Sequence, residues 1–128
     1  MSQSEPPFLF DAEGSHLAAE DFIVRLPEGI RDKASLLSCY AIAGHFPDYF
    51  GNNWDALNDC LRDFSWIRQK KIIIVHSDLP LSGDGKELHV YLEILQEALR
   101  SWASSKQHEL LVIFPPETQA TTTRLLDK

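Results

Sequence analysis

The sequence has no apolar run that approaches the roughly 18 residues of a membrane span, so we expect no transmembrane helix. Its first ten residues, MSQSEPPFLF, lack the basic start and the long apolar stretch of a secretory signal peptide. Both absences favour a cytoplasmic protein. Apolar residues still make up 44% of the chain and charged residues 24%, a composition typical of a folded globular domain.

Cysteine is scarce as well. Cys39 and Cys60 both fall in stretches with helical spacing, and no cluster of cysteine and histidine has the spacing of a zinc site. In a reducing compartment we expect the two cysteines to be small core residues rather than a disulfide. The sequence therefore predicts neither a zinc site nor a disulfide framework.

Basic residues are outnumbered, because 12 lysines and arginines stand against 19 aspartates and glutamates, for a net charge of −7 at pH 7. They are also scattered along the chain, whereas binding to nucleic-acid phosphates requires a basic patch. Direct nucleic-acid binding is therefore disfavoured. An acidic protein attracts basic partners instead, and the field of its surface can speed their encounter.

Glycine-rich phosphate-binding loops are missing too, since no GxGxxG or GxxxxGK[ST] motif follows a candidate strand. What the chain does contain is two uninterrupted β-branched runs, Lys70–His76 and Glu109–Phe114, which are typical of strands buried on both faces of a parallel sheet. Between them, apolar residues recur at helical spacing from Lys86 to about Ser104. Strand, helix and strand in this order predict a βαβ unit.

The first third of the chain gives shorter signals. Phe22–Leu26 is a strand candidate, and a helical pattern begins at Lys33 and ends at Gly44. Phe8–Phe10 follows two prolines and is expected to be an edge strand at most. The sequence thus predicts an α/β fold, a small three-stranded parallel sheet packed with helices. We divide the chain into an N-terminal extension (1–20), one domain (21–115) and a C-terminal tail (116–128).

The most unusual passage is FPDYFGNNWDALNDCLRDF, residues 46–64, which holds four aspartates, three asparagines and five aromatic residues. Asn52 or Asn53 is a suitable N-cap for a helix that begins near Trp54. At about 100° per residue such a helix has two distinct sides as far as Phe64. Its apolar stripe consists of Trp54, Leu57, Cys60, Leu61 and Phe64. Its acidic face consists of Asp55, Asn58, Asp59, Arg62 and Asp63.

The acidic face has local energetic costs. Aspartates four residues apart repel each other by about 0.2–0.5 kcal/mol, and near the C-terminal end the helix dipole opposes Asp63. The residues alone leave four interpretations open: a solvated helix face, a pair of catalytic carboxylates, a Mg²⁺ site formed by Asp55 and Asp59, or a surface that offers carboxylates to the arginines of a basic partner.

The fifteen residues from Pro47 to Leu61, PDYFGNNWDALNDCL, resemble the signature of the barstar family, which are intracellular protein inhibitors of barnase-type ribonucleases. That signature has proline, an acid, two aromatic residues, glycine, any residue, asparagine, an apolar residue and then Asp-Ala-Leu-x-Asp-Cys-Leu. The order of elements from Phe22 to Phe114 fits the family as well. The resemblance implies a three-stranded parallel sheet with helices. It also implies inhibition without a cofactor, in which the second helix and the loop before it plug the nuclease active site.

Seven positions match contact residues of the family: Asp59, Asp55, Tyr49, Gly51, Asn53, Asn58 and Glu97. The resemblance implies that Asp59 stands where an RNA phosphate binds and meets the arginines and the catalytic histidine of the nuclease. Asp55 and Glu97 supply further acidic contacts, and Tyr49 packs on the nuclease. Asn58 stands where the best-known family member has a large aromatic contact residue, which leaves the identity of the partner open.

The sequence therefore predicts a monomeric, non-enzymatic inhibitor, an antitoxin or immunity protein that binds one basic, barnase-like ribonuclease. We expect it to need no cofactor or metal and to bind neither nucleic acid nor membrane. The alternative is a binding module of the same fold that neutralises a different basic toxin or regulates another protein.

Overall fold

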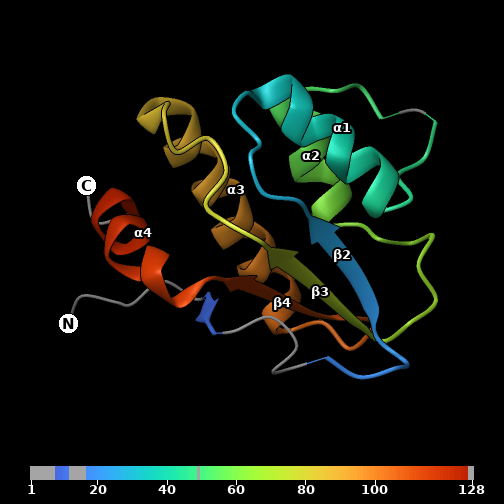
Figure 1. Ribbon diagram of the computed structural model, residues 1–128. Helices are drawn as coiled ribbons and strands as arrows, with labels where there is room; N and C mark the ends of the chain where they lie inside the picture. Colours follow the sequence, from blue (N-terminus) through green and yellow to red (C-terminus); the bar gives the residue numbers. More distant parts are fainter. Residues whose placement is uncertain (1–7, 12–16, 49, 127–128) are drawn as a thin grey trace.

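The computed structural model describes residues 8–11, 17–48 and 50–126, which form a sheet covered by helices (Figure 1). In chain order the elements are β1 (Leu9–Phe10), β2 (Phe22–Leu26), α1 (Lys33–Ala43), α2 (Trp54–Leu61), β3 (Lys71–His76), α3 (Gly85–Ala103), β4 (Glu109–Phe114), the 3₁₀ helix η1 (Pro116–Thr118) and α4 (Gln119–Leu126). The predicted α/β class with a parallel sheet is confirmed. The sheet has four strands, one more than the sequence predicted.

The strands follow the order β1-β4-β3-β2, and every neighbouring pair is parallel. The register places Ile73 of β3 between Ile23 of β2 and Leu111 of β4. In β3 the run Ile72–His76 is buried along its whole length. Burial on both faces explains why this strand is continuously β-branched and shows no alternation of apolar and polar residues.

The additional strand is β1, at the edge beside β4. Its two residues, Leu9 and Phe10, pair with Ile113 and Phe114. Two residues carry almost no strand signal of their own, and the pairing is supported by aromatic packing: the Phe10 and Phe114 rings stack with centroids 6.2 Å apart. An edge position was the one strand role that the preceding prolines allowed.

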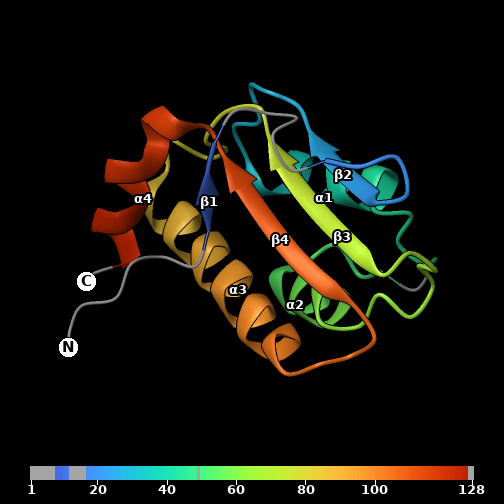
Figure 2. The same cartoon turned by 90° about the horizontal axis from the view of Figure 1, so that it is seen from below.

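Three helices cover one face of the sheet. Helices α1, α2 and α3 lie side by side over it, and α4 packs against α3 near β1 (Figure 2). The main core fills the space between sheet and helices, and its largest fully buried side chains include Tyr40, Tyr91, Phe64 and Phe114. On the other face Ile73, Val75 and Ile113 form a small second cluster.

Side-chain caps begin α1, α2 and α3. Asp32 accepts a hydrogen bond from the backbone N–H of Ser35 at 2.8 Å, which starts α1. Gly44 ends α1 as predicted, but with φ −91°, and the left-handed conformation falls on His45, with φ 54°. Gly44 is required for space instead, because a Cβ there would lie 2.7 Å from the Phe46 ring.

The C-terminal segment, which the sequence predicted only as a tail, forms η1 and α4. Proline at the start of η1 suits the first turn of a helix, where no N–H partner is needed. The domain boundary at residue 116 stays a prediction. None of the helices in the described part of the chain combines the length and hydropathy that a membrane span requires.

A buried chain of hydrogen bonds links β3 to two helices. His76 Nδ1 lies 2.9 Å from the carbonyl oxygen of Ile113, so this nitrogen carries the proton and donates it. Nε2 then accepts from the Tyr91 hydroxyl at 2.7 Å, and Tyr91 accepts from Tyr40 at 2.6 Å. Burial lowers the pKa of His76 from 6.5 to about 4 and raises the pKa of both tyrosines. All three side chains are therefore neutral at pH 7.

The neutral His76 makes the stability of the fold depend on pH. Above about pH 6.5 the imidazole is neutral in both the native and the unfolded chain, whereas between pH 6.5 and about 4 it is charged only in the unfolded chain. We expect this group alone to remove about 3 kcal/mol of unfolding free energy as pH falls through that window. Urea denaturation at a series of pH values measures the loss.

His76→Gln is the matched control for this pH dependence. Glutamine keeps a donor and an acceptor but does not titrate, so this variant starts from a lower stability and lacks the slope due to His76. Other groups titrate equally in both proteins, and the difference between the two profiles isolates this one. If the unfolding free energies of the two proteins fell in parallel with pH, His76 would not be held neutral in the native state.

A second stability prediction concerns Thr122 of α4. Its side chain is fully buried, and its hydroxyl has no hydrogen-bond partner among the described residues. Thr122→Val keeps the shape and removes the unpaired hydroxyl, so we expect about 1 kcal/mol of added stability, seen as a higher urea midpoint at unchanged m-value. Thr123→Val, on the partly exposed side of the same helix, should change stability by less than about 0.5 kcal/mol. A lower midpoint for Thr122→Val contradicts the prediction.

Candidate functional site

The loop that leads into α2 is anchored by aromatic packing. The Phe46 ring is buried and lies 4.9 Å from the Phe50 ring and 5.7 Å from the Trp66 ring, centroid to centroid. Asn52 adopts the left-handed conformation, with φ 54°, which asparagine tolerates better than most residues. Asn53 follows this turn, has extended backbone dihedrals and caps the helix.

The cap fixes where α2 begins. The Asn53 side-chain oxygen accepts from the backbone N–H of Ala56 at 2.7 Å, and its amide nitrogen donates to the carbonyl of Gly51 at 3.3 Å. Gly51 is exposed, and a Cβ there would lie 3.3 Å from the same amide nitrogen. The structure thus brings Gly51 and Asn53 together in one turn. Tyr49, also predicted to contact the partner, lies outside the described residues.

Most of the predicted apolar stripe of α2 is buried, with Leu57 and Leu61 fully inaccessible and Cys60 4% exposed, whereas Trp54 is only partly buried. The predicted helix end is wrong, because α2 stops at Leu61 and not at Phe64. Phe64 has φ 47°, and this left-handed turn places its ring in the core. Burial of a phenylalanine outweighs the backbone cost.

The early end of α2 shortens the acidic face. Asp63 lies beyond the helix, where its carboxylate accepts a hydrogen bond from the Ser65 hydroxyl at 3.3 Å. Asp55 and Asp59 remain on α2, one turn apart, and both are exposed. Within the described part of the chain, no ion pair or hydrogen bond neutralises either carboxylate.

A groove of about 240 Å³ lies between α2 and α3 and is lined by one of the two aspartates, Asp55. Its wall on α2 consists of Trp54, Asp55 and Asn58, and its wall on α3 of Val90, Glu93, Ile94 and Glu97. The structure therefore brings three of the predicted residues, Asp55, Asn58 and Glu97, to one groove, while Asp59 lies outside it on the same helix. The result is a partly apolar channel with carboxylates along its rim.

Glu93 is a rim residue that the sequence did not predict. It stands four residues before Glu97, one turn along α3, and this spacing was the available signal. Both glutamates have basic residues as neighbours: His89 Nε2 lies 3.6 Å from Glu93, and Arg100 pairs with Glu97 at 2.5 Å. These pairs are exposed, so they hold the side chains only weakly and a partner can replace them.

Near the acidic face, the Cys60 thiol is poorly suited to nucleophilic catalysis. Burial, followed by the charges of Asp63 and Asp59, raises the pKa of the Cys60 thiol to about 11. The thiol therefore stays protonated and is a poor nucleophile. Among residues 8–11, 17–48 and 50–126, no group of three or more histidine, cysteine or acidic side chains is placed to hold a metal ion.

A comparison with known protein families identifies the family of this chain. The family model described as Barstar (barnase inhibitor) matches residues 22–114, from the start of β2 to the end of β4. Comparisons with curated proteins and with solved structures returned no match. The matched segment contains α2, its cap and the groove, and it covers well over half of the chain. The chain belongs to the barstar family.

Proposed function

We propose that this protein inhibits a basic ribonuclease by binding it one to one and plugging its active site with α2. The observation that carries the proposal is the pair of exposed carboxylates, Asp55 and Asp59, one turn apart on α2. Neither has a partner among the described residues, and Asp55 lines the α2–α3 groove. We call these two aspartates and the groove the docking face. The family description, barnase inhibitor, supports a ribonuclease as the partner.

The repulsion between Asp55 and Asp59 favours binding to a basic partner. In the free protein they repel each other along the helix. Arginines of a nuclease would relieve that repulsion and form charge-assisted, bidentate hydrogen bonds, which are stronger than bonds between neutral groups. We propose that Asp59 makes the main contact with the phosphate-binding arginines and that Asp55 makes a second one.

The groove suits an arginine side chain of the partner. Its apolar wall, with Val90 and Ile94, can pack against the aliphatic stem. The guanidinium then reaches the rim, where Asp55 and Glu97 supply carboxylates, and Trp54 offers an aromatic surface. The net charge of −7 adds long-range attraction between inhibitor and nuclease.

The proposal makes the protein a cytoplasmic antitoxin or immunity protein rather than an enzyme. One observation favours a second candidate, a module of the same fold that neutralises a different basic toxin. Asn58 is half-buried in the groove, where the family resemblance places a large aromatic contact residue. A smaller side chain leaves more of the groove open, which would suit a partner of different shape.

Inhibition of a basic, barnase-type ribonuclease by the Asp59, Asp55 and Glu97 variants tests the proposal. We expect equimolar wild-type protein to abolish RNA cleavage. Asp59→Ala should weaken binding most, by about 3 kcal/mol or roughly a hundredfold, because it leaves arginines of the nuclease buried without a partner. Asp55→Ala and Glu97→Ala should each weaken it by about 1–2 kcal/mol, since their contacts stay nearer to solvent. Inhibition titrations give the affinities.

Two controls separate a specific contact from a general loss of charge. Glu109→Ala removes one exposed carboxylate at the amino end of β4 and should inhibit as well as the wild type. Asp59→Asn keeps the size of the side chain but removes its charge, so this variant should also bind the ribonuclease more weakly than the wild type. Association should slow as salt rises. Full inhibition by Asp59→Ala would show that the mechanism is wrong, and co-purification from the source cell would then name the partner.

A further inference from the structure

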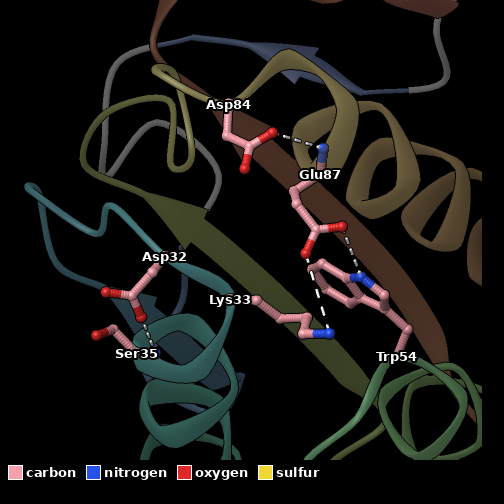
Figure 3. A network of polar contacts seen from close by, with 6 residues as sticks. All are labelled: Asp32, Lys33, Ser35, Trp54, Asp84 and Glu87. Atoms are coloured by element: carbon pink, nitrogen blue, oxygen red, sulfur yellow. Dashed lines mark hydrogen bonds and ion pairs between the residues drawn. The ribbon is translucent and has the colours of Figure 1, made fainter.

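The indole of Trp54 is held by two charged residues from the neighbouring helices (Figure 3). Its Nε1–H donates to Glu87 Oε1 at 3.3 Å. The other carboxylate oxygen of Glu87 lies 4.0 Å from Lys33 Nζ, and that ammonium lies 5.8 Å from the centroid of the Trp54 ring. Lys33, Trp54 and Glu87 thus form a closed triangle, which we call the clasp.

The clasp joins the first turns of three helices. Lys33 is the first residue of α1, Trp54 the first residue of α2, and Glu87 stands in the first turn of α3. The helix dipole favours Glu87 at that position and disfavours Lys33. The Glu87 carboxylate offsets the unfavourable placement of the lysine, so the pairing has a local electrostatic reason.

Beneath the clasp, the Trp54 ring rests on a rigid support. It stacks on Tyr91, with centroids 6.2 Å apart and an interplanar angle of 25°. The Tyr91 hydroxyl is bonded to His76 and Tyr40 in the core. Contacts from Glu87, Lys33 and Tyr91 therefore restrict the indole.

Trp54 differs from the other two tryptophans, both of which lie in described parts of the chain, in the acceptor of its indole hydrogen bond. Trp66 donates to the backbone carbonyl of Gly44 at 3.0 Å, and Trp102 donates to that of Leu61 at 2.7 Å. Trp54 alone donates to a charged side chain, and that side chain is about 30% exposed. The position of Trp54 therefore depends on a contact that a single substitution can remove without opening the core.

We propose that Glu87, itself held by Lys33, is a positioning residue for the docking face. It fixes the Trp54 ring, and with it the first turn of α2, so that Asp55 and the groove wall are already placed before the partner arrives. The role in binding rests on the proposed inhibitory function. Fixing the turn in advance removes an ordering cost from association, which strengthens the complex without any contact between Glu87 and the partner.

Hydrogen exchange in the free, isotopically labelled protein tests the clasp without a partner. Glu87→Ala should speed exchange of the Trp54 indole N–H and of the Leu57 amide, which donates to the Asn53 carbonyl in the first turn of α2. The indole N–H groups of Trp66 and Trp102 should exchange as in the wild type. Glu87→Gln keeps an acceptor oxygen but no charge and should give a smaller effect. Unchanged exchange at Trp54 in Glu87→Ala overturns the proposal.

A double-mutant cycle with a barnase-type ribonuclease tests the role in binding. Glu87→Ala should weaken the complex roughly tenfold, mainly through faster dissociation. Phenylalanine has no N–H for Glu87 to accept, so in a Trp54→Phe background the same change should have less than about a twofold effect. A structural defect or a direct contact of Glu87 with the partner predicts the full loss in both backgrounds, and that result overturns the positioning role.

Matched controls keep the two proposals separable. Glu109→Gln makes the same charge change at a remote exposed site and should leave both exchange and affinity unaltered. If the wild-type protein does not bind the ribonuclease, the proposed function fails, while the exchange measurement still decides whether the clasp holds α2. If the wild type binds and Glu87→Ala binds equally well, the positioning role fails and the inhibitory function stands.

Discussion

The docking face depends on the burial of the opposite side of α2. An isolated helix of this length is unstable in water, and two aspartates one turn apart make it less stable still. Leu57 and Leu61 are fully buried, and each contributes about 1.5–3 kcal/mol relative to an exposed side chain. That gain exceeds the charge repulsion several times over. The core therefore decides that α2 forms, and its outer side is free to carry charges that a solitary helix could not.

Trp54 is the residue at which core and docking face meet. Its ring stacks on Tyr91, whose hydroxyl belongs to the buried chain with His76, and its other contacts reach the groove and Glu87. A shift of α2 relative to α3 would disturb all of these contacts at once. The groove is therefore as rigid as the packing beneath it, and such rigidity favours affinity, because less order has to be created on binding.

The strands β2, β3 and β4 and the long helix α3 could be predicted because their sequence patterns are continuous and agree with their final environment. The start of α2 could also be predicted, since Asn53 signals a cap chemically. The end of α2 could not. No local preference favours φ 47° for Phe64, and only its place in the core explains that turn. Strand β1 likewise exists because β4 offers an edge, which two residues cannot signal alone.

The candidate site, like the fold, could be predicted from the sequence only in part. The motif named Asp55 and Asp59, because charged residues on a helix surface can be read from spacing, but the groove requires the distance between two helices far apart in the sequence. The clasp of Lys33, Trp54 and Glu87 requires three such helices.

Some residues of the groove also pack in the core and others do not, and this difference affects which partner the protein can bind. Asn58 and Glu93 line the rim and can change with little effect on the core, whereas Trp54 cannot, because the same ring packs on Tyr91. Substitutions at the rim can therefore redirect the docking face toward another basic protein while the buried side of α2 keeps the fold intact.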